Sequence, residues 1–123
     1  VLPLFGYGID VNMRTWIEAP IAPHGSLRDL IDTLEFEGKI TDFGDAHVEQ
    51  VLAQVRLALQ HVHASGLRHC DLASKNVLVF DFQPKPPRVT IRLADFGSAR
   101  AVRAGEVVEE TTGLEAELRE LLA

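Results

Sequence analysis

The sequence predicts an α+β fold, and two observations support this prediction. Between about residues 45 and 65, apolar residues recur at spacings of three and four, which is typical of the buried face of a helix. These positions are Val48, Val51, Leu52, Val55, Leu59 and Val62. Two β-rich runs follow, at 76–82 and 88–93, and the proline-rich connection between them indicates a hairpin.

The amino-terminal part predicts two short strands and then a helix. The apolar runs 1–9 and 13–21 are interrupted by glycine and proline and are separated by a turn-like Asp-Val-Asn. Ser26 stands where an N-cap residue would begin a helix. Gly66 is the expected C′ residue after the long helix, because glycine tolerates the left-handed conformation found there.

The last residues, 101–123, are acidic and contain leucines spaced for a weakly amphipathic helix. These leucines are Leu114, Leu118, Leu121 and Leu122. The sequence offers no partner for this helix. We therefore expect an acidic helical tail.

Composition limits the classes of function and the compartment. The 123 residues are 46% hydrophobic and 24% charged, as in a small globular domain or part of a larger one. The net charge is −6 and no basic cluster occurs, so nucleic acid is not a predicted partner.

Cys70 is the single cysteine, which favours a reducing compartment. No run approaches the roughly 20 apolar residues of a membrane span. We predict a cytoplasmic protein, or the cytoplasmic portion of a longer one, with residue 1 inside a longer polypeptide or a mispredicted gene.

Two short motifs carry the chemistry. The first runs from His69 through Asp71 to Asn76, and the second is Asp-Phe-Gly at 95–97. A loop after a long helix presents Asp71 to a substrate hydroxyl, and Asn76 can turn to a divalent ion just before a strand begins. Asp95 arrives at the end of the next strand, close to Asn76. Mg²⁺ prefers such hard oxygen ligands and shares its shell with phosphates.

These motifs resemble the catalytic loop, His-Arg-Asp-Leu-x-x-x-x-Asn, and the Asp-Phe-Gly metal loop of eukaryotic-type protein kinase catalytic domains. The resemblance implies a partial protein-kinase-like fold: the end of the small-lobe sheet, the hinge, and the first helices with the catalytic and metal-loop hairpin of the large lobe. It divides the chain into a partial kinase domain and an acidic tail with a truncated activation segment. The expected ranges are 1–100 for the partial domain, about 17–26 for the hinge, 69–76 for the catalytic loop, 95–97 for the metal loop and 101–123 for the tail.

The resemblance also implies site residues and cofactors. It implies transfer of the γ-phosphoryl group of Mg-ATP to a Tyr or Ser/Thr hydroxyl of a protein substrate. Asp71 would orient the hydroxyl and accept its proton, with Lys75 as the basic residue of the catalytic loop. Asn76 and Asp95 would hold Mg²⁺.

The segment 16–27 looks like the kinase hinge, where the backbone meets adenine. On this alignment Ala19 is the gatekeeper, the Pro20 carbonyl accepts from the adenine amino group, and the Ala22 amide and carbonyl face the ring. Leu78 would pack beneath adenine. The alternatives are a plain proline-rich connection for the segment and an ordinary core position for Leu78.

Several departures from the family pattern matter. Cys70 replaces an arginine that often pairs with a phosphorylated activation loop, so we predict activity that does not need this phosphorylation. Lys75 stands four residues after Asp71, which favours the tyrosine kinase or tyrosine-kinase-like branch. The sequence has no complete glycine-rich loop, no Val-Ala-x-Lys strand and no Ala-Pro-Glu. We therefore expect an incomplete catalytic domain that is inactive by itself.

Two alternative functions remain from the residues alone. The first is a non-catalytic kinase-like binding fragment, with the acidic tail after Arg100 as its contact surface. The second is a small-molecule phosphotransferase of the aminoglycoside or choline kinase type, which also uses Asp-x-x-x-x-Asn and a later metal aspartate. Those enzymes usually lack Phe-Gly after that aspartate, so the motif at 95–97 favours a protein kinase.

Overall fold

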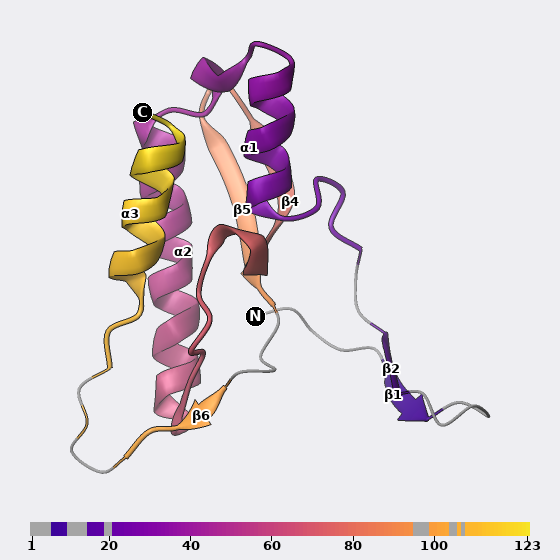
Figure 1. The fold of residues 1–123 in the computed structure, drawn as a ribbon, viewed down its shortest axis with the longest axis vertical. Helices are drawn as coiled ribbons and strands as arrows, with labels where there is room; N and C mark the ends of the chain where they lie inside the picture. The colour runs from indigo at the N-terminus through magenta and orange to yellow at the C-terminus, as the bar shows by residue number, and fades with distance from the viewer. Residues whose placement is uncertain (1–5, 10–14, 19–20, 95–98, 104–105, 107) are drawn as a thin grey trace.

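The computed structural model of this chain confirms the α+β architecture (Figure 1). It describes residues 6–9, 15–18, 21–94, 99–103, 106 and 108–123. Its elements are β1 (Gly6–Ile9), β2 (Thr15–Glu18), α1 (Leu27–Phe36), η1 (Ile40–Asp42), α2 (Asp45–Ala64), β3 (Leu67–Arg68), η2 (Ser74–Asn76), β4 (Val77–Gln83), β5 (Arg88–Leu93), β6 (Arg100–Ala101) and α3 (Thr111–Leu121). Helix α2 contacts both β5 and α3, whereas α1 contacts β4. None of the described helices is long and apolar enough to cross a lipid bilayer.

The two strands predicted near the amino terminus are present. Strands β1 and β2 form an antiparallel pair that sets Gly6 opposite Glu18 and Ile9 opposite Thr15. In Figure 1 this pair lies apart from α2 and α3, at the far end of the segment that leads into α1.

Helix α1 begins at the N-cap that the sequence predicts. The Asp29 amide donates to Ser26 Oγ at 3.1 Å, and the Ser26 amide donates to Asp29 Oδ2 at 3.0 Å. This reciprocal capping box satisfies two amides that the helix itself leaves unpaired. Gly25 has a φ of 67°, and a Cβ atom there would lie 2.7 Å from Asp29 Oδ2. Glycine thus allows the chain to turn tightly into the capped helix.

Helix α2 is the central element, and its apolar face is buried as the periodicity predicts. The six predicted positions, Val48, Val51, Leu52, Val55, Leu59 and Val62, are each at most 7% exposed. The helix ends where Gly66, the predicted C′ residue, takes a φ of 81°. This reversal sends the chain into β3 and the catalytic loop.

The predicted hairpin is confirmed, and α2 covers one of its edges. Strands β4 and β5 pair from Val77 opposite Leu93 to Gln83 opposite Arg88. The α2 side chains Gln50 and Gln54 accept from amides of β5, at Val89 and Ile91 respectively, each at 2.9 Å. Gln54 Nε2 also donates to the Val89 carbonyl at 2.7 Å. Helix α2 therefore serves β5 as a second hydrogen-bonding neighbour, which secures the strand that leads to the metal loop.

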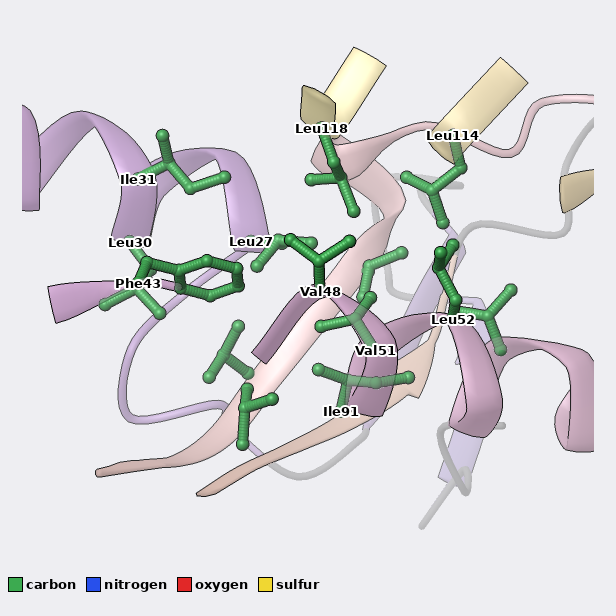
Figure 2. Close-up of a cluster of buried hydrophobic side chains, with 14 of the residues drawn as sticks. Leu27, Leu30, Ile31, Phe43, Val48, Val51, Leu52, Ile91, Leu114 and Leu118 are labelled. Atoms are coloured by element: carbon green, nitrogen blue, oxygen red, sulfur yellow. The ribbon is translucent and has the colours of Figure 1, made fainter. Parts of the chain in front are cut away.

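The expectation that the terminal helix lacks a partner is wrong. Leu114 and Leu118 of α3 are 0% exposed and point toward Val48 and Leu52 of α2 (Figure 2). The reason is that the single apolar stripe of α2 is wide enough to contact both the hairpin and α3. The acidic segment is consequently part of the core, and its helix lies against α2.

Candidate catalytic site

The predicted catalytic loop, 69–76, lies between β3 and β4 and is held at its entry by strand pairing. Strand β3 pairs with β6, and the Val102 amide donates to the Gly66 carbonyl at 2.8 Å. At its exit, the 3-10 helix η2 leads directly into β4. The loop thus emerges from the end of α2 and returns to the hairpin.

His69 connects the catalytic loop to the residue before the metal loop. Its side chain is 0% exposed, and Nε2 lies 2.8 Å from the Ala94 carbonyl oxygen. The Asp71 amide donates to His69 Nδ1 at 3.2 Å, so Nε2 carries the proton and donates to Ala94. One buried imidazole therefore holds both the backbone of Asp71 and the end of β5.

Asp71 and Asn76, two of the predicted site residues, are in direct contact. Asn76 Nδ2 donates to the Asp71 carbonyl at 2.7 Å and to Asp71 Oδ2 at 3.2 Å. Asn76 is 5% exposed, whereas the Asp71 side chain is 40% exposed. The asparagine thus positions a carboxylate that solvent or a substrate can reach.

Lys75, the predicted basic residue, lies beside the same carboxylate. Its Nζ is 3.9 Å from Asp71 Oδ2, and its side chain is 66% exposed. An exposed pair at this distance contributes about 0 to 1 kcal/mol to stability. This ion pair therefore adds little to the stability of the loop. Its effect is to place the positive charge of Lys75 next to the Asp71 carboxylate.

The predicted metal ligands are only partly visible. Asp95 lies outside the described residues. The Ala94 amide donates to the Asn76 carbonyl at 2.9 Å, so the residue before Asp95 is hydrogen-bonded to the other predicted ligand. Because Asn76 turns Nδ2 toward Asp71, its Oδ1 is the atom that can bind a hard cation. Within the described residues, no group of three His, Cys, Asp or Glu side chains could hold a metal ion.

Glu110, which the sequence reasoning missed, holds the start of the catalytic loop. Its carboxylate accepts from the amides of His69 and Cys70 and contacts His63 Nε2, each at 2.8 Å. The side chain is 6% exposed. Burial opposes its ionisation, but the hydrogen bonds from His63 and the two amides outweigh burial and hold the pKa of Glu110 below its ordinary 4.5.

Glu117, also missed, holds the end of the loop. Its two carboxylate oxygens accept from the Ser74 amide and the Ser74 hydroxyl, each at 2.8 Å. Ser74 is 1% exposed, so this contact is sheltered from water. A signal was present in the sequence, because Glu110 and Glu117 stand at i and i+7 and therefore share a side with Leu114 and Leu118.

Comparison with known proteins decides the family. The protein kinase domain family matches residues 9–115. The chain belongs to that family. This match covers the residues predicted as hinge, catalytic loop and metal loop, and the kinase resemblance of the sequence is confirmed.

Two relatives of this kinase-family chain are serine/threonine kinases by name. It is 30% identical over 90 residues to serine/threonine-protein kinase PSK1 of Saccharomyces cerevisiae, covering 73% of this chain and 6% of the relative. It is 26% identical over 113 residues to serine/threonine-protein kinase SBK1 of Danio rerio, covering 92% and 26%. The chain therefore spans about a quarter or less of these relatives. The preference for the tyrosine branch is not confirmed by them.

Solved kinase structures share the fold. The crystal structure of the Rad53 kinase domain and SCD2 superposes with a TM-score of 0.61 at 22% identity, over 82% of this chain and 33% of that one. The same protein in complex with AMPPNP gives 0.60 at 21% identity, over 81% and 34%. The predicted partial kinase-like fold is thus confirmed.

The hinge of this kinase-family chain is partly described. The predicted contacts Ala19 and Pro20 lie outside the described residues. The Ala22 carbonyl oxygen accepts from the Gly25 amide at 3.1 Å. A contact of this oxygen with adenine would therefore use its second lone pair. The Val79 amide donates to the Gly25 carbonyl at 2.9 Å, and Ser26 pairs with half-buried Leu78. The predicted hinge therefore runs beside the strand that carries Leu78.

Proposed function

We propose that this chain carries the catalytic loop of an ATP-dependent protein kinase, which transfers the γ-phosphoryl group to a protein hydroxyl. The observation that supports this most is the contact of Asn76 Nδ2 with Asp71 Oδ2 at 3.2 Å, in a loop joined by His69 to the residue before Asp95. Family membership and the names of the relatives favour a protein substrate over a small molecule. The proposal includes either a Ser/Thr or a Tyr hydroxyl as the acceptor.

The chemistry follows from the two oxygens of Asp71. Asn76 and Lys75 lie on the Oδ2 side, so Oδ1 is oriented to accept the proton of the substrate hydroxyl. The hydroxyl oxygen then bonds to the γ-phosphorus as the bond to the β–γ bridging oxygen breaks. The positive charge of Lys75 partly offsets the negative charge of the Asp71 carboxylate.

ATP and Mg²⁺ are the proposed cofactors. Asn76 Oδ1 and Asp95 would hold Mg²⁺, and Leu78 with the hinge residues Ala19, Pro20 and Ala22 would receive adenine. Mg²⁺ supplies charge neutralisation of the phosphates when bound. The AMPPNP complex of the Rad53 kinase domain supports a nucleotide in this fold. The 123 residues contain no complete glycine-rich loop or strand lysine, so we propose slow or no turnover by them alone. We also propose a cytoplasmic location for the protein, or for the portion of it that carries these residues.

The test is phosphoryl transfer by the full polypeptide that the transcript encodes. Asp71→Asn should abolish transfer of ³²P from Mg-[γ-³²P]ATP to a peptide library, with a loss of at least about 100-fold, because the proton acceptor is gone. Asp81→Asn is the matched control, since Asp81 pairs with Arg88 on the hairpin, at 2.7 Å. Equal turnover by the Asp71 variant and the wild type would refute the proposed function.

A further inference from the structure

Strand β4 has one residue more than β5 in the middle of the hairpin. Val79 lies opposite Ile91 and the next pair is Asp81 opposite Thr90, so Phe80 has no partner in β5. An extra residue of this kind is a β-bulge, which leaves its own backbone unpaired and disrupts the ladder locally. The hairpin is therefore weakly joined at this point, between its tip and the half that leads to the catalytic and metal loops.

The sequence of β4 requires the bulge. Val79 is 0% exposed, and Phe82 packs against the same core, with its ring centroid 5.8 Å from that of Phe43. Residues three apart point to opposite faces of a regular strand, and the extra residue brings both to the core. The Asp81 side chain stays 44% exposed and pairs with Arg88 at 2.7 Å. The weak point is thus a fixed feature of the hairpin.

Gln54 of α2 binds β5 at this point, on the edge that faces away from β4. Its Oε1 accepts from the Ile91 amide at 2.9 Å, and its Nε2 donates to the Val89 carbonyl at 2.7 Å. These two residues flank Thr90, which is the first residue past the change of register. We call this pair of hydrogen bonds the Gln54 bridge, because it joins the two halves of β5 across the weak point.

Gln50 makes similar contacts one turn earlier in α2. It accepts from the Val89 amide at 2.9 Å and donates to the Pro87 carbonyl at 2.8 Å. Positions four apart in a helix are about 6 Å apart along its axis, close to the about 6.8 Å between residues two apart in a strand. A side-chain amide has the donor and acceptor of a peptide group, so the two glutamines bind β5 as a neighbouring strand would. The contacts of Gln50 all lie on the tip side of the bulge, whereas those of Gln54 cross it.

The half of β5 beyond the bridge ends at the predicted metal loop. The Ala94 amide donates to the Asn76 carbonyl at 2.9 Å, and Asp95 is the next residue in the sequence. This hydrogen bond involves neither glutamine, so it reports independently where the end of β5 lies. A magnesium site demands near-ideal octahedral geometry, and movement of the end of β5 relative to Asn76 would therefore weaken it.

We propose that Gln54 is a positioning residue, and that its bridge fixes the end of β5, and with it Asp95, relative to Asn76. Because α2 also leads into the catalytic loop, one helix then sets the positions of both Asp71 and the metal loop. The consequence for metal binding rests on the proposed function, whereas the position of β5 can be measured without nucleotide.

Hydrogen exchange of individual amides, followed by NMR on the 123-residue chain, tests the bridge. Gln54→Met keeps an unbranched side chain and removes both hydrogen-bonding groups. Exchange should therefore accelerate at least about tenfold at Ile91, which loses its acceptor, and also at Ala94, which Gln54 does not contact.

Two further variants on α2 isolate the effect of crossing the bulge. Gln50→Met acts only on the tip side, so it should accelerate exchange at Val89 and leave Ala94 unchanged. Gln60→Met makes the same substitution at an exposed position of the helix and is the matched control. It should change exchange at neither site.

The outcomes separate the bridge from general stability. Unchanged exchange at Ala94 in Gln54→Met would overturn the proposal. Equal acceleration throughout α2 in that variant would also overturn it, and so would an equal effect of Gln50→Met at Ala94.

A second measurement separates the bridge from the proposed function. With Mn²⁺ and ATP added, Gln54→Met should raise the Mn²⁺ concentration that broadens the Asn76 side-chain amide by at least about threefold, whereas Gln60→Met should not. An unchanged concentration would overturn the role of Gln54 in positioning Asp95. If the wild type shows no broadening, the proposed metal binding fails, while the exchange result still decides the bridge.

Discussion

At the residue scale, the catalytic loop is organised by side chains that accept hydrogen bonds from backbone amides. His69 accepts from Asp71, and Glu110 accepts from His69 and Cys70. Asn76 adds a donor to both the carbonyl and the carboxylate of Asp71. A buried polar group is costly unless it is paired, so breaking one of these hydrogen bonds is unfavourable. Together the hydrogen bonds limit the conformations that the loop can adopt.

The ionisation of Glu110 predicts how loop stability depends on pH. Its pKa is lowered in the folded chain, so its stabilisation is fully present above the unfolded value of about 4.5 and is lost as pH falls through the folded value. His63 is the titratable group in contact with it, and Arg56 lines the same pocket. Neighbouring Glu109 stays charged in this range, because hydrogen bonds from Thr111 and then Thr112 lower its pKa to about 2.

The measurement is amide protection at His69 and Cys70 between about pH 6 and pH 3, relative to Glu110→Gln. Wild-type protection should exceed that of the variant near pH 6, and the difference should disappear on acidification. A difference that stays the same from pH 6 down to the pH at which the chain unfolds would show that the charge of Glu110 does not stabilise the loop.

Sequence reasoning at this scale found the residues of the motifs and missed those that support them. Asp71 and Asn76 were predicted as site residues because their spacing matches a known loop. Glu110 and Glu117 belong to no motif, and acidic residues near a helix are usually solvated. Their role depends on α3 packing against α2, which local spacing does not encode.

At the element scale, α3 is an integral part of the core, because Leu114 and Leu118 are fully buried. Leu118→Ala should destabilise the chain by about 2–5 kcal/mol, through lost burial and a cavity. Leu57→Ala is the control: Leu57 is 69% exposed on α2, and its loss should change stability by less than about 0.5 kcal/mol. Urea unfolding followed by circular dichroism measures both. Equal effects of the two substitutions would contradict the packing of α3.

The elements themselves were predictable where periodicity is strong. Helix α2 and the β4–β5 hairpin follow from apolar spacing and from the proline-rich connection, and α1 follows from the Ser26 cap. The pairing of Gln50 and Gln54 with β5 was not predictable. Polar residues at i and i+4 on a helix normally indicate a solvated face, and only the position of the strand makes them hydrogen-bond partners.

At the scale of the whole molecule, the chain brings three separated segments to one place. Pairing of Ser26 with Leu78 aligns the hinge segment with β4, the His69–Ala94 contact joins the catalytic loop to the end of β5, and α3 secures the loop from the other side. The contact of α3 with the loop depends on residues 106–123, all of which follow the two motifs.

We propose that Asn76 and the metal loop bind a divalent cation with nucleotide beside Asp71. The most direct measurement is paramagnetic broadening of NMR signals, with Mn²⁺ in place of Mg²⁺ and ATP added to the 123-residue chain. We predict that the Asn76 side-chain amide and the Asp71 amide broaden first, and that Asn76→Ala removes the effect at Asp71. Broadening that spares both residues, or that Asn76→Ala leaves unchanged, would contradict this account.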